Sequence, residues 1–166
     1  MLSIRRFSDS DGDHCLRLFR DTVRRINAKD YTATQILAWA SDDTDAKRWI
    51  SRFSGRHAYV AQMEGAIVGF SDMSSDGYLD RLFVSADHQR LRIGTALISQ
   101  LLCDAASHDI DVVYTDASIT ARPFFAKMGF GNPVEQSVEC RGSTFTNFRM
   151  TRNTTDNHRL HRNGGG

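Results

Sequence analysis

Residues 78–102 read YLDRLFVSADHQRLRIGTALISQLL, and most of the organisation of the chain follows from this stretch. A β-rich run ends at Val84, a short polar turn follows at 85–88, and apolar residues at helical spacing then predict a helix over 93–107. A second β-rich run comes next, at 110–116. A strand, a helix and a second strand in this order favour a βαβ unit with parallel strands and a right-handed crossover.

Shorter elements surround this unit. Apolar spacing predicts a first strand at 2–7 and helices over 9–26, 31–40, 43–53 and 123–128. β-rich runs separated by turn residues predict strands at 57–63, 66–73, 78–84, 134–140 and 144–150. The order predicts an α/β (α+β) domain with a mixed, largely antiparallel sheet, a central βαβ crossover and flanking helices.

Length and composition fit one domain. The chain has 166 residues, of which 40% are hydrophobic and 25% charged, ordinary values for a globular protein. We predict a domain over 1–152 and a disordered tail over 153–166, because NTTDNHRLHRNGGG is polar, lacks aromatic residues and ends in three glycines.

Charge and cysteine usage exclude several classes of protein. The formal net charge is +1, from 21 Lys and Arg against 20 Asp and Glu, which argues against a nucleic-acid partner. No apolar run reaches the length of a membrane span, and charged residues between Arg5 and Asp11 stand where a signal peptide would be apolar. Three scattered cysteines without a CxxC motif indicate neither a disulfide framework nor a metal site, so we expect a cytoplasmic protein without metal or membrane partner.

The turn between the central strand and helix is a candidate anion site. Backbone N–H groups at the start of a helix attract phosphate, and Arg90 and Arg92 add positive charge. The P-loop pattern GxxxxGK[ST] and the dinucleotide pattern GxGxxG are both absent from the sequence. An ordinary strand-to-helix connection with solvated arginines is the alternative interpretation.

Several motifs resemble one family. Gln89-x-x-Arg92-x-Gly94 resembles the acetyl-CoA pyrophosphate loop, Q/R-x-x-G-x-G/A, of the GCN5-related N-acetyltransferases (GNATs). PFFAKMGF at 123–130 is similar to the FYxxxGF helix end of that family, and the order of elements over 1–150 also fits. YTATQILAWA, DASITARPFFAKMGF and VECRGSTFTNFRM together resemble the YafP-like branch of bacterial GNATs.

The resemblance implies direct transfer of an acetyl group from acetyl-CoA to a primary amine of a small molecule or peptide in a ternary complex. Backbone N–H groups over 82–84 would bind pantetheine and polarise the thioester carbonyl. The residues expected to bind acetyl-CoA are Leu82, Phe83, Val84, Gln89, Arg90, Leu91, Arg92, Ile93, Gly94, Thr95, Ala96, Phe124 and Lys127. GNATs are often homodimers, although nothing in this sequence marks an interface.

Two positions depart from the family pattern. Arg92 stands where the loop has its first glycine, so a positive φ there would cost energy, whereas a helical φ would accommodate arginine. Phe125 stands where many members have the tyrosine that protonates the departing CoA thiolate. Phenylalanine cannot donate a proton.

Two residues are candidates for catalysis. Asp80 lies in an apolar strand two residues before Leu82, so both side chains are expected on one side of the sheet, where the carboxylate could orient or deprotonate the amine. An ion pair with a nearby arginine is the alternative. Tyr114 is the candidate acid in place of the missing tyrosine, and a core aromatic residue is its alternative. His88 is a weaker candidate because a histidine in a turn is usually solvated.

The acceptor pocket is expected between the early helices and the last hairpin. Tyr31 and Trp39 are candidate lining residues, and Arg141 in the hairpin turn could face an acidic group of the acceptor. Core packing and solvent exposure are the respective alternatives. Two other functions remain open: an acyl-CoA sensor or partner module with little transfer activity, and a domain that binds another phosphorylated cofactor.

Overall fold

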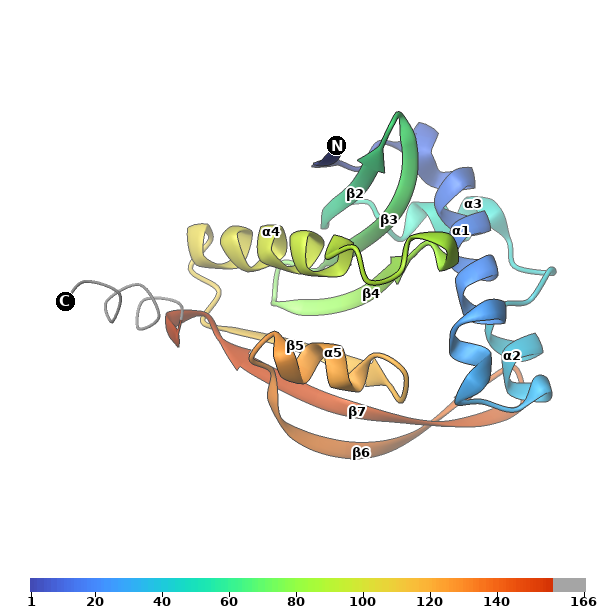
Figure 1. Cartoon of the computed structure of the whole chain (residues 1–166). Coiled ribbons are helices and arrows are strands. Elements are labelled where there is room, and N and C mark those ends of the chain that lie inside the picture. Colours follow the sequence, from blue (N-terminus) through green and yellow to red (C-terminus); the bar gives the residue numbers. More distant parts are fainter. Residues whose placement is uncertain (157–166) are drawn as a thin grey trace.

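The computed structural model describes residues 1–156, which form one seven-stranded sheet with helices on both faces (Figure 1). The order of strands across the sheet is β1-β2-β3-β4-β5-β7-β6. The strands are β1 (Leu2–Arg6), β2 (His57–Met63), β3 (Ala66–Met73), β4 (Tyr78–Val84), β5 (Val112–Ser118), β6 (Gly131–Cys140) and β7 (Ser143–Asn153). Only the β4–β5 pair is parallel among these strands, so the predicted mixed and largely antiparallel sheet is confirmed.

Two groups of helices cover the sheet, each with its own hydrophobic cluster. The helices are α1 (Gly12–Arg25), α2 (Ala33–Trp39), α3 (Ala46–Ser51), α4 (Ile93–Ser107) and α5 (Arg122–Lys127). The first three pack over one cluster with β2 and β3, and α4 and α5 pack over the other. Short 3-10 turns lie at Asp9–Asp11, Asn27–Lys29, Ala86–His88 and Thr154–Asp156.

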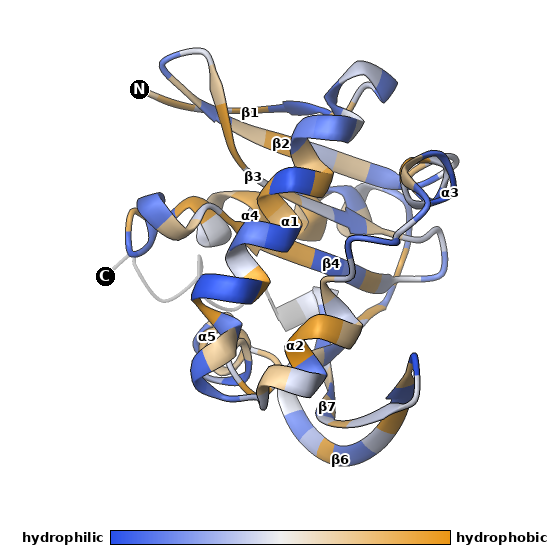
Figure 2. Cartoon of the chain, turned by 90° about the vertical axis from the view of Figure 1, so that its right-hand side faces the viewer, coloured by the Kyte–Doolittle hydropathy of each residue, from blue (hydrophilic) through white to orange (hydrophobic). Residues whose placement is uncertain are grey.

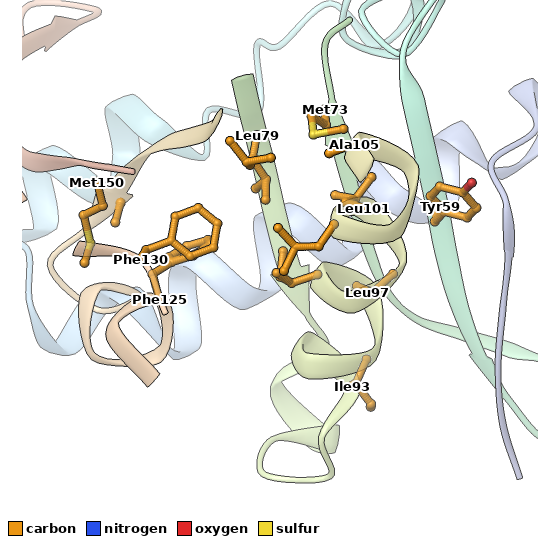
Figure 3. Packing of buried hydrophobic residues seen from close by; sticks show 14 of the residues in the cluster. Tyr59, Met73, Leu79, Ile93, Leu97, Leu101, Ala105, Phe125, Phe130 and Met150 are labelled. Carbon is orange, nitrogen blue, oxygen red and sulfur yellow. The ribbon is translucent and has the colours of Figure 1, made fainter. Parts of the chain in front are cut away.

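The cluster beneath α4 is continuous across the sheet. Leu97 and Leu101 of α4 are fully buried against Leu79 of β4, and Phe125 and Phe130 extend the cluster toward α5 (Figure 3). This packing joins the two halves of the sheet on one face, although the strands β4 and β5 diverge (Figure 1).

The helix α1 packs on the sheet through an apolar stripe. Cys15, Leu16, Phe19 and Val23 recur three or four residues apart and are buried, whereas the opposite side is charged (Figure 2). Burial of this stripe orients α1 along the edge of β4, where its C-terminal half contributes to the site described below.

Predicted elements agree with the structure at the centre and differ at helix ends. The strands over 57–63, 66–73 and 78–84 and the helix over 93–107 have the predicted bounds. The helix expected over 31–40 begins only at Ala33, because Thr32 caps it and accepts a hydrogen bond from the Gln35 N–H (3.2 Å). The helix expected over 43–53 is confined to Ala46–Ser51, after the cap Asp45.

The C-terminal boundary also differs from the prediction. The last strand continues to Asn153, and the Thr154 hydroxyl, which is buried, donates to the carbonyl of Ile110 (2.7 Å). A disordered tail beginning at 153 is therefore wrong for its first residues, and the remainder of that tail, 157–166, lies outside the described residues. No helix within residues 1–156 combines the length and the hydropathy needed to cross a membrane.

Candidate functional site

The strands β4 and β5 pair over two residues and then separate. Tyr78 pairs with Tyr114 and Leu79 pairs with Thr115. Further along, β4 remains paired with β3 and β5 with β7, so the two edges that face each other have no strand partner within residues 1–156. Backbone polar groups on these edges are available to a bound molecule.

A β-bulge lies at the point of separation. Met73 of β3 pairs with Leu79, and its neighbour Asp72 pairs with Arg81. Asp80 is therefore an extra residue without a partner in β3. Bulges re-aim side chains and are frequent next to active sites.

The bulge reverses one expectation about side-chain direction. Leu82 packs against the cluster beneath α4, whereas Asp80 is paired with Arg52 and Arg56, which follow α3 on the other face. The prediction that Asp80 and Leu82 share one side of the sheet is wrong, because the extra residue breaks the strict alternation of the strand.

A cavity of about 610 Å³ opens where the strands separate, and we call it the loop cavity. Its walls come from β4, β5, the start of α4, and α5. Eleven of the thirteen residues expected to bind acetyl-CoA line it: Leu82, Phe83, Val84, Gln89, Arg90, Arg92, Ile93, Gly94, Thr95, Phe124 and Lys127. Leu91, which is 51% exposed, and Ala96 are not among its lining residues, so for these two the prediction is not supported.

The loop before α4 has an unusual backbone. Arg90 and Arg92 have φ of +62° and +60°, in the left-handed region. Of the two backbone conformations considered for Arg92, the structure has the positive φ. This conformation costs about 1–2 kcal/mol for a residue with a Cβ atom. The first intrahelical bond joins the Ala96 N–H to the Arg92 carbonyl (3.1 Å), so the N–H groups over 93–95 precede it and have no intrahelical acceptor.

Gly94 lets α4 and α5 approach each other. A Cβ atom placed on Gly94 would lie 3.3 Å from Cζ of Phe124, tighter than ordinary van der Waals contact. The two helices therefore meet at the wall of the loop cavity, and the glycine in the loop motif has a packing reason that the sequence alone does not reveal.

The helix α1 fastens the loop in place. The Thr22 hydroxyl donates to the Val84 carbonyl (3.0 Å), and the Arg25 guanidinium binds the Asp87 carboxylate (2.6 Å). The hydrogen bond from Arg25 holds the pKa of Asp87 below its usual value. Thr22 also lines the loop cavity, and sequence reasoning missed it because its partner is 62 residues away.

A second cavity of about 450 Å³ lies between α2 and the β6–β7 hairpin, and we call it the hairpin cavity. All three predicted acceptor-binding residues line it: Tyr31, Trp39 and Arg141. The ring of Trp39 makes edge contacts with Tyr31 (centroids 5.5 Å apart), Phe145 (6.1 Å) and Phe83 (6.2 Å). The structure thus brings together residues from three distant parts of the sequence.

Tyr31 and Arg141 also fix the walls of this cavity. The Tyr31 hydroxyl accepts from the Ile119 N–H (2.9 Å) and donates to the Thr146 carbonyl (3.3 Å), while burial raises the pKa of Tyr31. Arg141, in the hairpin turn with φ of +45°, donates to the Ala38 carbonyl (2.7 Å). Both side chains therefore line the cavity and also form hydrogen bonds that hold its walls together.

Asp80 is one of the residues that line both cavities. Its carboxylate lies 2.9 Å from the Arg52 guanidinium and 3.5 Å from that of Arg56, and 16% of its side chain is exposed. The ion pair considered as an alternative is present, and the carboxylate is also accessible from the site.

Asp116 is a second carboxylate that lines both cavities, and sequence reasoning missed it. It accepts hydrogen bonds from Arg149 (2.5 Å), Gln136 (2.8 Å) and the Tyr78 hydroxyl (3.0 Å). Burial acts to raise the pKa of Asp116, but these hydrogen bonds outweigh burial and leave the pKa below its usual value.

The positions of Tyr114 and Phe125 bear on the source of the proton for the CoA thiolate. The Tyr114 hydroxyl donates to the Asp76 carboxylate (2.9 Å), and Tyr114 lines neither cavity, so its position does not support the expected role as an acid. Phe125 lines the loop cavity but is 3% exposed and packs in the core. The nearby His88 imidazole is hydrogen-bonded to the Ser85 hydroxyl (3.0 Å).

The chain is similar to proteins of one family in sequence and in structure. Residues 27–152 match the family described as "Acetyltransferase (GNAT) domain". The chain is 34% identical over 149 residues to YafP of Escherichia coli (strain K12), called an uncharacterized N-acetyltransferase, covering 90% of this chain and 94% of that protein.

Solved structures agree with this match. A GCN5-related N-acetyltransferase from Rhodopseudomonas palustris, named "Aminotransferase, Class-II", has a TM-score of 0.88 and 29% identity over 91% of this chain and 94% of its own. The PaiA N-acetyltransferase of Thermoplasma acidophilum, in complex with coenzyme A, shares the fold with a TM-score of 0.73 and 16% identity over 92% of this chain and 99% of its own. Together with the separated strands and the loop before α4, these matches show that the chain belongs to the GNAT acetyltransferase family and is an acyltransferase.

Proposed function

We propose that this protein transfers the acetyl group of acetyl-CoA directly to a primary amine of a small molecule or peptide while both are bound. The observation that carries the proposal is that two cavities share a wall, made of Trp39, Asp80, Phe83, Asp116 and Ser118. Reactants held in adjoining cavities lose little further freedom on reaction, so proximity supplies much of the rate enhancement.

Acetyl-CoA belongs in the loop cavity under this proposal. The free N–H groups over 93–95 and the positive end of the helix dipole attract the pyrophosphate, and Arg90 and Arg92 add charge. The Thermoplasma acidophilum relative in complex with coenzyme A supports this assignment. The unpaired edge of β4 over 82–84 would hold pantetheine and polarise the thioester carbonyl, where each such donor is commonly worth about 3–4 kcal/mol.

The amine approaches from the hairpin cavity. An alkyl amine has a pKa of ~10 and arrives protonated at pH 7, so a base must remove one proton before the nitrogen can attack. Asp80 is the proposed acceptor of that proton, directly or through water, because its carboxylate is accessible from both cavities. The nitrogen–carbon bond then forms, the carbon–sulfur bond breaks, and the nitrogen loses its second proton.

The departing CoA thiolate takes up one proton. Phe125 cannot supply it, and the core surrounds its ring. A free thiol has a pKa of about 8.5, so a thiolate leaves without obligatory protonation in the transition state. We therefore assign this proton to water rather than to a dedicated side chain.

Thermal shift with acetyl-CoA, CoA and ATP, followed by a thiol-release assay with amines, tests the proposal. A ligand at 100 times its Kd stabilises by about 2.7 kcal/mol, which is a rise in Tm of about 5–10 °C for a domain of this size. We expect a shift with both CoA species, none with ATP, and release of CoA thiol only when an amine is present. CoA binding without thiol release would favour the acyl-CoA sensor, and a comparable ATP shift would favour another phosphorylated cofactor.

The variant Arg92→Gly separates backbone from side chain in the loop. Glycine accepts a φ of +60° without the cost that arginine bears, whereas the guanidinium is lost from the loop cavity. We expect the Kd of CoA to rise about tenfold, the scale of one charge-assisted hydrogen bond. Arg48→Gln, on the exposed side of α3, is the matched control and should leave the Kd unchanged. An unchanged Kd in Arg92→Gly would assign phosphate binding to the backbone alone.

A further inference from the structure

Three kinds of side chain line the hairpin cavity: carboxylates, aromatic rings and a guanidinium. Asp80 and Asp116 lie at the wall shared with the loop cavity, and Arg141 lies in the hairpin turn. Aromatic side chains also line the cavity: Trp39 and Phe83 belong to the shared wall, and Tyr31 and Phe145 pack against Trp39. An acceptor that fits must satisfy all three kinds of side chain.

The aromatic part of the lining is suited to a flat apolar body. Tyr31, Trp39 and Phe145 are in mutual contact, with ring centroids 5.5–6.1 Å apart and steep interplanar angles. Rings in this arrangement present both edges and faces, and an inserted aromatic ring gains edge-to-face or stacked contacts of about 0.5–1.5 kcal/mol beyond its burial. A flexible aliphatic chain gains burial alone.

The three arginines that line the cavity are not equivalent. Arg52 is paired with Asp80 (2.9 Å), and Arg81 is paired with Asp72 (3.0 Å). Arg141 instead donates to the Ala38 carbonyl (2.7 Å) and the Thr44 hydroxyl (3.4 Å), and no carboxylate of residues 1–156 is bonded to it. Neutral partners thus position a guanidinium whose charge is not compensated, in a part of the hairpin cavity that the loop cavity does not share.

Hydrogen bonds join the α2 region to the hairpin beside the cavity. Gln35 of α2 donates to the Thr144 carbonyl (2.8 Å), and Tyr31 and Arg141 join the same two regions. These bonds tie α2 to the hairpin along the side of the cavity, which favours a small molecule over a protein segment.

We propose that the acceptor is a small molecule with an aminoalkyl group on an aromatic ring and an anionic group, such as a carboxylate, across the ring from it. The amine reaches Asp80 at the shared wall, the ring lies among the aromatic side chains, and the anion binds Arg141. This inference rests on the proposed function, since it names the acceptor for the same acetyl transfer. The nitrogen of the ammonium group loses two protons and bonds to the acetyl carbon, the carbon–sulfur bond breaks, and CoA leaves as a thiolate that takes one proton from water.

Four amines test the proposal without any variant: 4-(aminomethyl)benzoate, benzylamine, 6-aminohexanoate and hexylamine. They combine the presence and absence of a ring with the presence and absence of a carboxylate. We expect the value of kcat/KM for 4-(aminomethyl)benzoate to exceed each of the others at least tenfold. Equal or faster acetylation of hexylamine, or no gain from the carboxylate, would overturn the proposal.

Variants then locate the two contacts. Arg141→Gln should reduce the preference for 4-(aminomethyl)benzoate over benzylamine about tenfold, and Trp39→Leu should reduce the preference for benzylamine over hexylamine. Arg48→Gln, an exposed arginine that lines neither cavity, should change neither ratio. A preference that survives Arg141→Gln in a variant with unaltered Tm would overturn the assignment of the anion to this residue.

Different results would overturn the proposed acceptor and the proposed function. If acetyl-CoA produces a thermal shift and none of the four amines is acetylated, the acceptor proposed here is overturned and the CoA site stands. If acetyl-CoA produces no shift, the proposed function is overturned.

Discussion

Two adjacent residues of β4 form ion pairs of opposite character. Arg81 binds Asp72 through two nitrogens (3.0 and 3.1 Å), and their side chains are 5% and 0% exposed. Asp80 binds Arg52 through a single contact of 2.9 Å, and those side chains are 16% and 49% exposed. The β-bulge accounts for the difference, because it keeps Arg81 paired with β3 and turns Asp80 toward the cavities.

The Arg81–Asp72 pair stabilises the fold, whereas the Asp80–Arg52 pair lies at the candidate site. The Arg81 guanidinium also lies 3.8 Å from the centre of the Phe53 ring and 4.8 Å from that of Trp49, so two aromatic rings shield most of it from solvent. Water has little access to either partner there. Around Asp80, water and a substrate can both enter, so its carboxylate can exchange partners.

Loss of Arg81 is the change with the largest expected effect. Arg81→Leu leaves the buried Asp72 carboxylate with only the longer contact to Arg56 (3.5 Å), and loss of the main partner of a buried charge typically costs about 3–5 kcal/mol. We expect Tm to fall by about 10 °C or more, measured by circular dichroism. A fall of less than about 2 °C would show that the buried pair is not what holds β3 and β4 together.

Asp80→Asn sharpens the contrast at the neighbouring residue. A partly exposed pair contributes at most about 1 kcal/mol, so Tm should fall by no more than a few degrees. Removal of a general base commonly costs about 10²–10⁴-fold, and we expect kcat/KM for the amine to fall at least 100-fold while the Kd of CoA is retained. An active Asp80→Asn variant would assign proton removal to another group, with Asp116 the next to test.

The centre of the fold is predictable from sequence because its signals are local. Glu64 and Gly65 have φ of +51° and +81°, as a two-residue hairpin turn requires, and apolar runs on both sides fix β2 and β3. Helix ends were placed less well, although Thr32 and Gln35 already form a capping-box pattern in the sequence that marks the start of α2.

The site is less predictable because it depends on register and on distant pairs. The bulge at Asp80 exists only in the pairing of β4 with β3, so counting alternate residues gave the wrong face for that side chain. Asp116 is identified by what it meets across the sheet: its partner Arg149 is 33 residues away and comes from β7. A continuous motif predicts the loop residues directly, and most of them line the loop cavity. Leu91, which is exposed and lies outside that lining, shows that a motif position does not fix where a side chain points.

The contribution of Asp116 to stability can be tested by varying the pH. The pKa of Asp116 is lower in the folded protein than its usual value, so this group stabilises the fold fully above about pH 4, the usual carboxyl range, and ceases to do so as pH falls through the folded pKa. Asp116→Asn should cost about 2 kcal/mol at pH 7, and its difference from the parent protein should shrink steadily below about pH 4. Urea unfolding at several pH values measures both. A deficit that stays constant down to about pH 2 would indicate lost packing rather than a lost charge.

Arg52→Gln should have the smallest effect on stability and is the most direct test of the role given to Asp80. Arg52 is half-exposed and makes one contact with that carboxylate, so its loss should cost less than about 1 kcal/mol. Arg56, 3.5 Å away, remains as a counter-ion. If an incoming ammonium group must displace Arg52 from Asp80, the variant should bind the amine more tightly, and KM should fall a fewfold while kcat changes little. A large drop in kcat would instead mean that Arg52 holds the carboxylate in position, and the exposed pair would then be as much a part of the working structure as the buried one beside it.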